Sequence, residues 1–191
     1  MTVVVITPPE PVVTFEEVAK HLADVPAEDR EYVEALTAAA TAWIDGPAGT
    51  LRRAIGIQML EARGWWGCGQ FRLPYPPAIQ IVSVSYADAD GGRHDADPST
   101  YQLDGNEIVV SRGASWVSRP DHRIRYWTGY GKQDEADPEK WINAAPPPIK
   151  VAIMMLVAQW YNTRENVITG TITSTMPFAV DALLQPFRVY R

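Results

Sequence analysis

The feature that most constrains this fold is the stretch of residues 146–165, which begins with three consecutive prolines and continues from Ile149 with mostly apolar residues as far as Tyr161. Proline lacks an N–H and has a fixed φ, so it suits the first turn of a helix and not its interior. A helix that is apolar on nearly all sides is buried on more than one of them. At about 1.5 Å per residue the helix is too short to cross a membrane. We therefore predict a central core helix, with three core candidates: Ile153, Leu156 and Trp160.

A second amphipathic helix is predicted over residues 27–45, with Trp43 as a further core candidate. Its apolar residues fall on one helical stripe, and the alanines at 38–40 would let another helix, which we expect to be 149–164, approach closely. Before it, Thr14 and Glu17 have the spacing of a capping box, which predicts a short helix ending near Leu22. A last short helix is predicted over 179–185.

The middle of the chain, about residues 53–131, changes to a strand pattern. Residues 55–61 alternate weakly, 79–86 form a clear strand, 101–110 have the pattern of a hairpin, and 123–127 form another strand. The charged residues 132–145 are predicted to be a linker. The predicted fold class is therefore α+β: a helical bundle (14–46 and 146–186) with an inserted small antiparallel β unit and extended terminal arms, forming one domain over residues 1–191.

Composition argues against several classes of function. The net charge is −6, which disfavours a protein that binds nucleic acid through overall attraction to phosphate. A single cysteine, Cys68, allows no internal disulfide, and the N-terminus does not resemble a secretory signal. We expect a soluble protein, with no membrane partner, made in a reducing cytoplasm.

No motif assembles a catalytic, metal or cofactor site, so we predict none of the three. Residues 88–91 match a calcium loop only in part, because Tyr86 stands where the first carboxylate should be. Residues 129–132 lack the leading glycine and the final hydroxyl residue of a phosphate loop. The three histidines are scattered. The basic residues Arg52, Arg53, Arg119, Arg123 and Arg125 are expected to form surface ion pairs. Two alternatives stay open: a small hydrolase-like enzyme that uses the β unit, and a nucleic-acid-binding module.

Three blocks of sequence, in order, cover nearly the whole chain. The first is the helical segment that ends at residues 38–44, and the third joins 148–165 to 176–188. The second contains 73–77, 81–91, 101–103 and 126–131. Together they resemble the head–tail connector (adaptor) proteins of long-tailed bacteriophages and gene transfer agents, most closely the longer members that carry a β insertion.

This resemblance implies a structural role and no enzymatic activity. Such proteins form a homo-oligomeric, dodecameric ring beneath the portal protein, extend the DNA channel, and join the capsid to the next neck or tail component, a stopper or tail terminator. DNA would pass through without specific binding, and an acidic chain suits that because it repels phosphate. The expected location is the neck of a virion or virus-like particle, with the host cytoplasm during assembly.

The C-terminal tail, residues 187–191, is the expected portal-docking element. Pro186 prevents the last helix from continuing, so the tail should leave it in an extended form and add to a partner. The alternative is a tail that folds back on its own β unit. Aromatic side chains are common at contact surfaces, so we take three tryptophans as interface candidates in addition to the tail residues. The interface candidates are Phe187, Arg188, Val189, Tyr190, Arg191, Trp65, Trp66 and Trp116.

Overall fold

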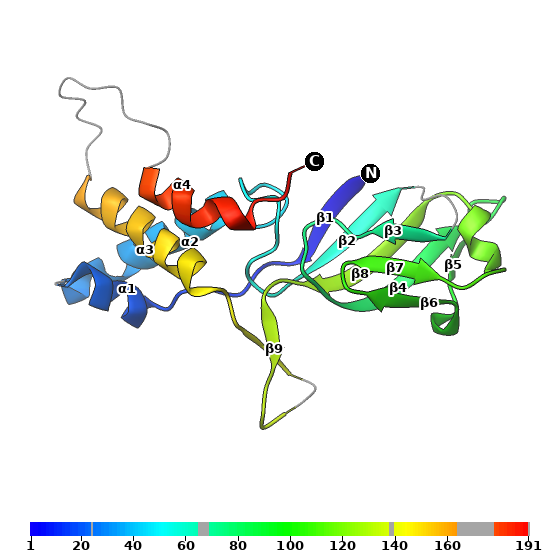
Figure 1. The fold of residues 1–191 in the computed structure, drawn as a ribbon, viewed down its shortest axis with the longest axis horizontal. Coiled ribbons are helices and arrows are strands. Elements are labelled where there is room, and N and C mark those ends of the chain that lie inside the picture. Colours follow the sequence, from blue (N-terminus) through cyan, green and yellow to red (C-terminus); the bar gives the residue numbers. More distant parts are fainter. Residues whose placement is uncertain (24, 65–68, 138–139, 164–177, 191) are drawn as a thin grey trace, which may run out of the picture. The chain divides into compact units, whose positions relative to one another are not determined.

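The computed structural model describes residues 1–23, 25–64, 69–137, 140–163 and 178–190. The chain divides into two compact units (Figure 1). Residues 1–10 and 53–143 form one, which we call the β unit; residues 11–52 and 144–191 form the other, the helical unit.

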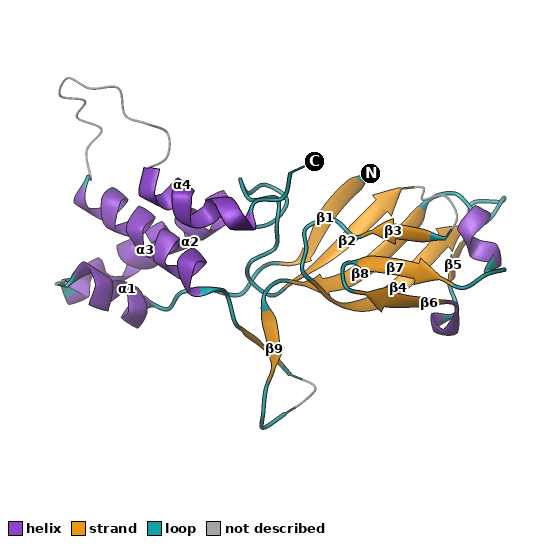
Figure 2. Ribbon diagram, in the orientation of Figure 1, coloured by secondary structure: helices purple, strands orange, loops and turns teal. Residues whose placement is uncertain are grey.

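The β unit is built from two antiparallel sheets and a hairpin (Figure 2). The larger sheet has the order β1-β2-β8-β4-β5 and contains Thr2–Thr7, Gln58–Gly64, His122–Thr128, Ala78–Ala87 and Arg93–Asp95. The smaller sheet has the order β3-β7-β6 and contains Gln70–Arg72, Glu107–Val110 and Tyr101–Asp104. The hairpin pairs β9 (Gly131–Gln133) with β10 (Trp141–Asn143), and two short 3₁₀ turns, Pro98–Thr100 and Ser115–Ser118, complete the unit.

The core of the β unit follows from the two-residue period of its strands, which sends alternate side chains to opposite faces. One face of the larger sheet contributes Leu60, Ala62, Val84, Ile124 and Tyr126 to an apolar cluster. The smaller sheet and the turns add further side chains to the same cluster: Leu73, Ile108, Val110 and Trp116. The other face of the larger sheet carries Glu61, Arg123 and Arg125, together with the apolar side chains of Val4, Met59 and Trp127.

The helical unit is organised around α3 (Pro147–Asn162), which packs against α1, α2 and α4. Its interior side chains are Ile149, Ala152, Ile153, Leu156 and Val157. The other helices are α1 (Phe15–Leu22), α2 (Arg30–Ile44) and α4 (Phe178–Leu184), with 3₁₀ turns at Ala27–Asp29 and Gln185–Phe187. No helix in these described stretches is both long and apolar enough to cross a membrane. The prediction of a central core helix is confirmed.

The predicted helical bundle is wrong, although the class is α+β. The described residues contain ten strands in three antiparallel sheets, one of which is the β9–β10 hairpin, and the four α-helices there are short. The N-terminal arm is also not free, because residues 2–7 pair with β2 as the edge strand β1. Partner strands lie far apart in the sequence, so the local pattern of residues does not reveal which strands pair or how large the sheet is.

Two local predictions need correction. Within the segment predicted to be a linker, residues 131–133 and 141–143 pair as the hairpin β9–β10. In α2, Ala38 and Ala39 are exposed, while the buried stripe is Val33, Thr37, Ala40, Thr41 and Ile44. The threonines fit this stripe because their hydroxyls donate to the backbone oxygens of Val33 and Thr37, both at 2.8 Å.

Candidate functional site

The C-terminal tail begins after a 3₁₀ turn that contains Pro186. The backbone N–H of Val189 donates to the carbonyl of Leu51 at 3.0 Å, and Arg188 Nη2 bonds to Asp181 Oδ1 at 3.1 Å. Both partners belong to the helical unit. Tyr190 is 72% exposed, and Arg191 lies outside the described residues. The tail is thus held at its start and offers an aromatic ring to solvent at its end.

The predicted tryptophans fall in different places. Trp65 and Trp66 lie outside the described residues, together with Cys68. Trp116 is buried in the β-unit core, where its indole N–H donates to Thr100 Oγ1 at 2.9 Å. Trp43 and Trp160 are half-buried and their rings contact each other at a centroid distance of 6.0 Å, whereas Ile153 and Leu156 are fully buried.

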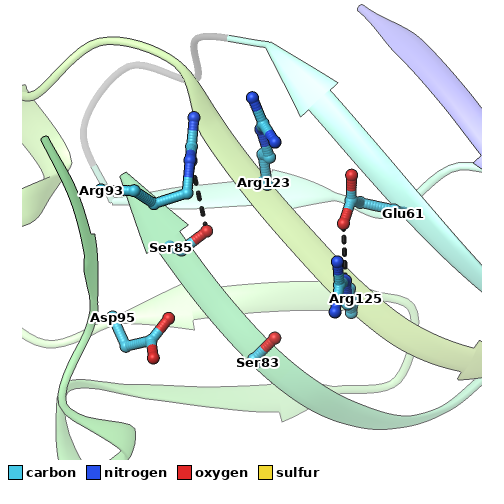
Figure 3. Close-up of a pocket in the computed structure, with 7 residues that line it drawn as sticks. All are labelled: Glu61, Ser83, Ser85, Arg93, Asp95, Arg123 and Arg125. Atoms are coloured by element: carbon cyan, nitrogen blue, oxygen red, sulfur yellow. Dashed lines mark hydrogen bonds and ion pairs between the residues drawn. The ribbon is translucent and has the colours of Figure 1, made fainter. Parts of the chain in front are cut away.

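A polar pocket lies on the outer face of the larger sheet (Figure 3). It encloses about 150 Å³. Strand alternation places its residues there: Glu61 on β2 is opposite Arg125 on β8, which is opposite Ser83 on β4. The full lining is Glu61, Ser83, Ser85, Arg93, Asp95, Arg123 and Arg125.

Glu61 anchors this face. Its side chain is 1% exposed, and its two carboxylate oxygens accept from Nε of Arg63 and Nε of Arg125, both at 2.6 Å. Burial alone would raise the pKa of Glu61, but hydrogen bonds from Arg125 and Arg63, together with their charges, outweigh that effect and lower its pKa. The carboxylate is therefore ionised and held between two partly exposed guanidinium groups.

A second carboxylate, Asp121, is also shared by two arginines. It forms ion pairs with Arg93 and with Arg123, the latter at 3.5 Å. Arg93 Nη1 also donates to Ser85 Oγ at 3.3 Å and to the carbonyl of Asp121 at 3.2 Å. Four guanidinium groups are thus organised around two carboxylates.

This arrangement is suited to recognition of charge. Ser83 and Ser85 are surrounded by arginines and carboxylates, and the site has no histidine to act as a general base. Within the described stretches no cluster of histidine, cysteine and acidic side chains could hold a metal ion. The partial calcium loop forms a turn in which Asp88 accepts from the N–H groups of Asp90 and Gly92 at 3.0 and 2.7 Å and pairs with His94.

Sequence reasoning found part of this face. The expectation of ion pairs is confirmed for Arg123 and Arg125. The burial of Glu61 was missed, because its strand alternates only weakly and the partners Arg63 and Arg125 are assigned by sheet register. The alternation Arg123-Ile-Arg125 was the one available signal, since it places two arginines on one side of a strand.

No protein-family model and no curated protein sequence matches this chain. Solved structures do match in fold. A chain from the neck of an empty gene transfer agent (GTA) particle, computed with C6 symmetry, has a TM-score of 0.75 at 21% identity. A chain from the virion of a native GTA particle has 0.68 at 23%, and one from the neck of a native GTA particle, computed with C12 symmetry, has 0.67 at 21%. Each comparison covers 100% of this chain and 97% of the other. The likeness shows a shared fold over the full length.

Proposed function

We propose that this chain is a structural subunit of the neck of a phage-like or gene transfer agent particle, and that it is not an enzyme. The observation that carries the proposal is the full-length similarity in fold to GTA neck chains, with a TM-score of 0.75 and 97% coverage of the other chain. A fold shared from end to end, including both units, is a stronger indication than similarity of one common module.

The finer proposal is a head–tail connector (adaptor) that forms a ring, a dodecamer, beneath the portal protein. The neck structures with similar chains were computed with C6 and C12 symmetry. A homo-oligomeric ring is a closed assembly with cyclic symmetry, so these symmetries favour the proposed ring. The ring would extend the DNA channel and present a surface to a stopper or tail terminator. A net charge of −6 would limit sticking of DNA in that channel.

Imaging of purified particles tests this role. Particles carrying a tagged copy of the chain, labelled with gold or a tag-specific antibody fragment, should show the label at the neck, between head and tail. Removing the gene should leave filled heads without tails. Label found only on the tail tip or the capsid shell, or normal tailed particles without the gene, would refute the proposal.

Within this role we propose residues 187–191 as the portal-docking element. The backbone bond from Val189 to Leu51 and the ion pair of Arg188 hold the start of the tail, while Tyr190 projects an exposed ring. An exposed aromatic side chain on a positioned backbone is typical of an anchor that fills a pocket on a partner. The tail would then join another protein by adding a strand or filling a groove.

Two variants separate docking from fold-back. Tyr190→Ala removes only the exposed ring, so it should leave the melting temperature unchanged and reduce the yield of tailed particles. Deletion of 187–191 also removes the bond to Leu51 and the Arg188–Asp181 pair, so it should lower stability slightly and abolish joining. Asp181→Asn serves as the control, since it weakens the tail's attachment but keeps the ring of Tyr190. A truncated protein that still completes infectious or transducing particles would falsify the docking role.

A further inference from the structure

The β unit carries two surfaces of opposite charge. The first, which we call the arginine face, surrounds the pocket described above and consists of Arg63, Arg93, Arg123 and Arg125. These four guanidinium groups share the carboxylates of Glu61 and Asp121, and Asp95 also lines the pocket. Positive charge therefore remains in excess on this face, although the chain as a whole is acidic.

The second surface is the acidic tip, residues 134–137, which directly follows β9. Its sequence is Asp-Glu-Ala-Asp, with three carboxylates, and Lys132 and Lys140 lie on either side of it in the sequence. Hydrogen bonds hold this turn: Asp134 N–H donates to Lys140 O at 2.9 Å, and Ala136 N–H donates to Asp134 Oδ1 at 3.0 Å. Glu135 and Asp137 are exposed on this turn.

The hairpin that carries the acidic tip is fixed at its base. Asn143 Oδ1 accepts from the backbone N–H of Ile57 at 3.0 Å, and Asn143 Nδ2 donates to Glu10 at 3.2 Å. Gly131 packs closely, since a side chain there would come within 3.0 Å of Ile79 and 3.1 Å of Trp141. These contacts hold the base of the hairpin against the β unit, from which β9 extends in Figure 1.

The two surfaces lie toward opposite ends of the larger sheet. Arg123 is near the start of β8, Arg125 is at its middle, and the hairpin follows its end at Thr128. At about 3.3 Å per residue, Arg123 and Thr128 are roughly 17 Å apart along the strand. The hairpin then leaves the two sheets (Figure 1).

We propose that the acidic tip of one copy docks on the arginine face of a neighbouring copy. Two different complementary patches on one molecule make a heterologous, head-to-tail contact, which closes into a ring or continues as a filament. Opposite charge would steer the copies into register and set their orientation. This inference names the surfaces that join neighbouring subunits, and the placement of that contact in a ring rests on the proposed function.

A second copy fits this face better than nucleic acid does. The carboxylates of Glu61, Asp95 and Asp121 lie among the four arginines, so they would repel a run of closely spaced phosphates. A peptide loop with separate carboxylates can instead enter such a network one group at a time, keeping each arginine paired.

Disulfide trapping between two differently labelled full-length proteins tests the contact. One carries Glu135→Cys in the tip and the other Ser83→Cys in the pocket, both with Cys68→Ser. We expect mixed dimers to form about tenfold faster than with a matched control, Gln102→Cys, which is exposed on the other sheet, and to slow in high salt. Equal rates for the two positions would overturn the proposal.

Charge reversal is a second, independent test of the contact. Arg93→Glu with Arg123→Glu reverses the face while leaving the Glu61 pairs intact, and Asp134→Lys with Asp137→Lys reverses the tip. Each reversal alone should remove the preference in trapping, and combining a reversed face with a reversed tip should restore it. Failure of the restored pair, with all proteins shown to be folded by circular dichroism, would overturn the contact.

Two further outcomes are distinguishable. In the first, a short DNA duplex binds the wild-type protein but not the variant with the reversed face, and the rate of disulfide trapping is unchanged by reversal of the tip. The face would then be a nucleic-acid surface and the proposal would be wrong. Trapping concerns only contact between copies. Absence of the chain from the particle neck would therefore refute the proposed function while leaving a positive trapping result intact.

Discussion

Replacing Glu61 with glutamine tests the physical account of the polar face most directly. The substitution keeps the shape of the side chain and removes its charge. In the wild-type protein the carboxylate is 1% exposed and accepts two short bonds, from Arg63 and Arg125, whose side chains are 41% and 51% exposed. In Glu61→Gln one acceptor oxygen becomes an NH₂ group that faces a guanidinium donor.

The expected cost is about 2 kcal/mol. Hydrogen bonds to charged groups contribute about 1.5–3 kcal/mol each, but the glutamine retains one acceptor, and water can solvate the two half-exposed arginines. Losing a partner from a fully buried pair would cost about 3–5 kcal/mol, which sets an upper bound. For a chain of this size, 2 kcal/mol corresponds to a fall in melting temperature of roughly 4–8 °C.

The pH dependence has a defined sign. Because the folded protein lowers the pKa of Glu61 below its ordinary 4.5, the ionised group contributes stability that is present above pH 4.5 and is lost as the pH falls through the folded-state pKa. The difference between wild type and Glu61→Gln should therefore be constant near neutral pH and shrink below about pH 4.5.

Thermal and urea unfolding, followed by circular dichroism, would measure both effects. Glu107→Gln is the matched control in the same unit, since Glu107 is 27% exposed, accepts from Gln70, and pairs at 3.3 Å with Arg72, which is 76% exposed. That exposed pair should contribute at most about 1 kcal/mol. If the two variants lose the same stability, or if the Glu61 effect persists unchanged at low pH, the buried carboxylate does not hold the face together as argued.

Three further predictions concern the helical unit and assembly. Leu156→Ala should cost about 2–5 kcal/mol in urea unfolding, because Leu156 is fully buried. Trp160→Ala should cost less than the roughly 3–5 kcal/mol of a fully buried tryptophan, because Trp160 is only half-buried. A larger loss of stability for Trp160→Ala than for Leu156→Ala would contradict the packing. Thr14→Ala removes the bond to the backbone of Glu17 and should destabilise α1 by about 1 kcal/mol, measured by the same assay; no change would show that the cap is dispensable. The isolated chain should be mainly monomeric by size-exclusion chromatography with light scattering, because like-charged subunits repel, and a stable ring at micromolar concentration without a portal would contradict this.

Local signals in the sequence were sufficient for the helices. The capping box is confirmed by reciprocal bonds between Thr14 and Glu17 at 2.9 and 3.2 Å. Three prolines followed by a continuous apolar run located α3 and its buried side chains, and the last helix also appears where it was predicted. These features depend on residues within a few positions of one another, so the order of residue types along the chain carries the information.

The sheets and the polar face required the tertiary structure. The strand β1 pairs with β2 more than fifty residues away, and β2 pairs with β8 a further sixty residues on. Those pairings bury Glu61 and bring Arg125 to its carboxylate across 64 residues of sequence. A carboxylate in a weakly alternating strand reads locally as a surface residue, and only sheet register, set by packing of the opposite face, decides which arginines surround it.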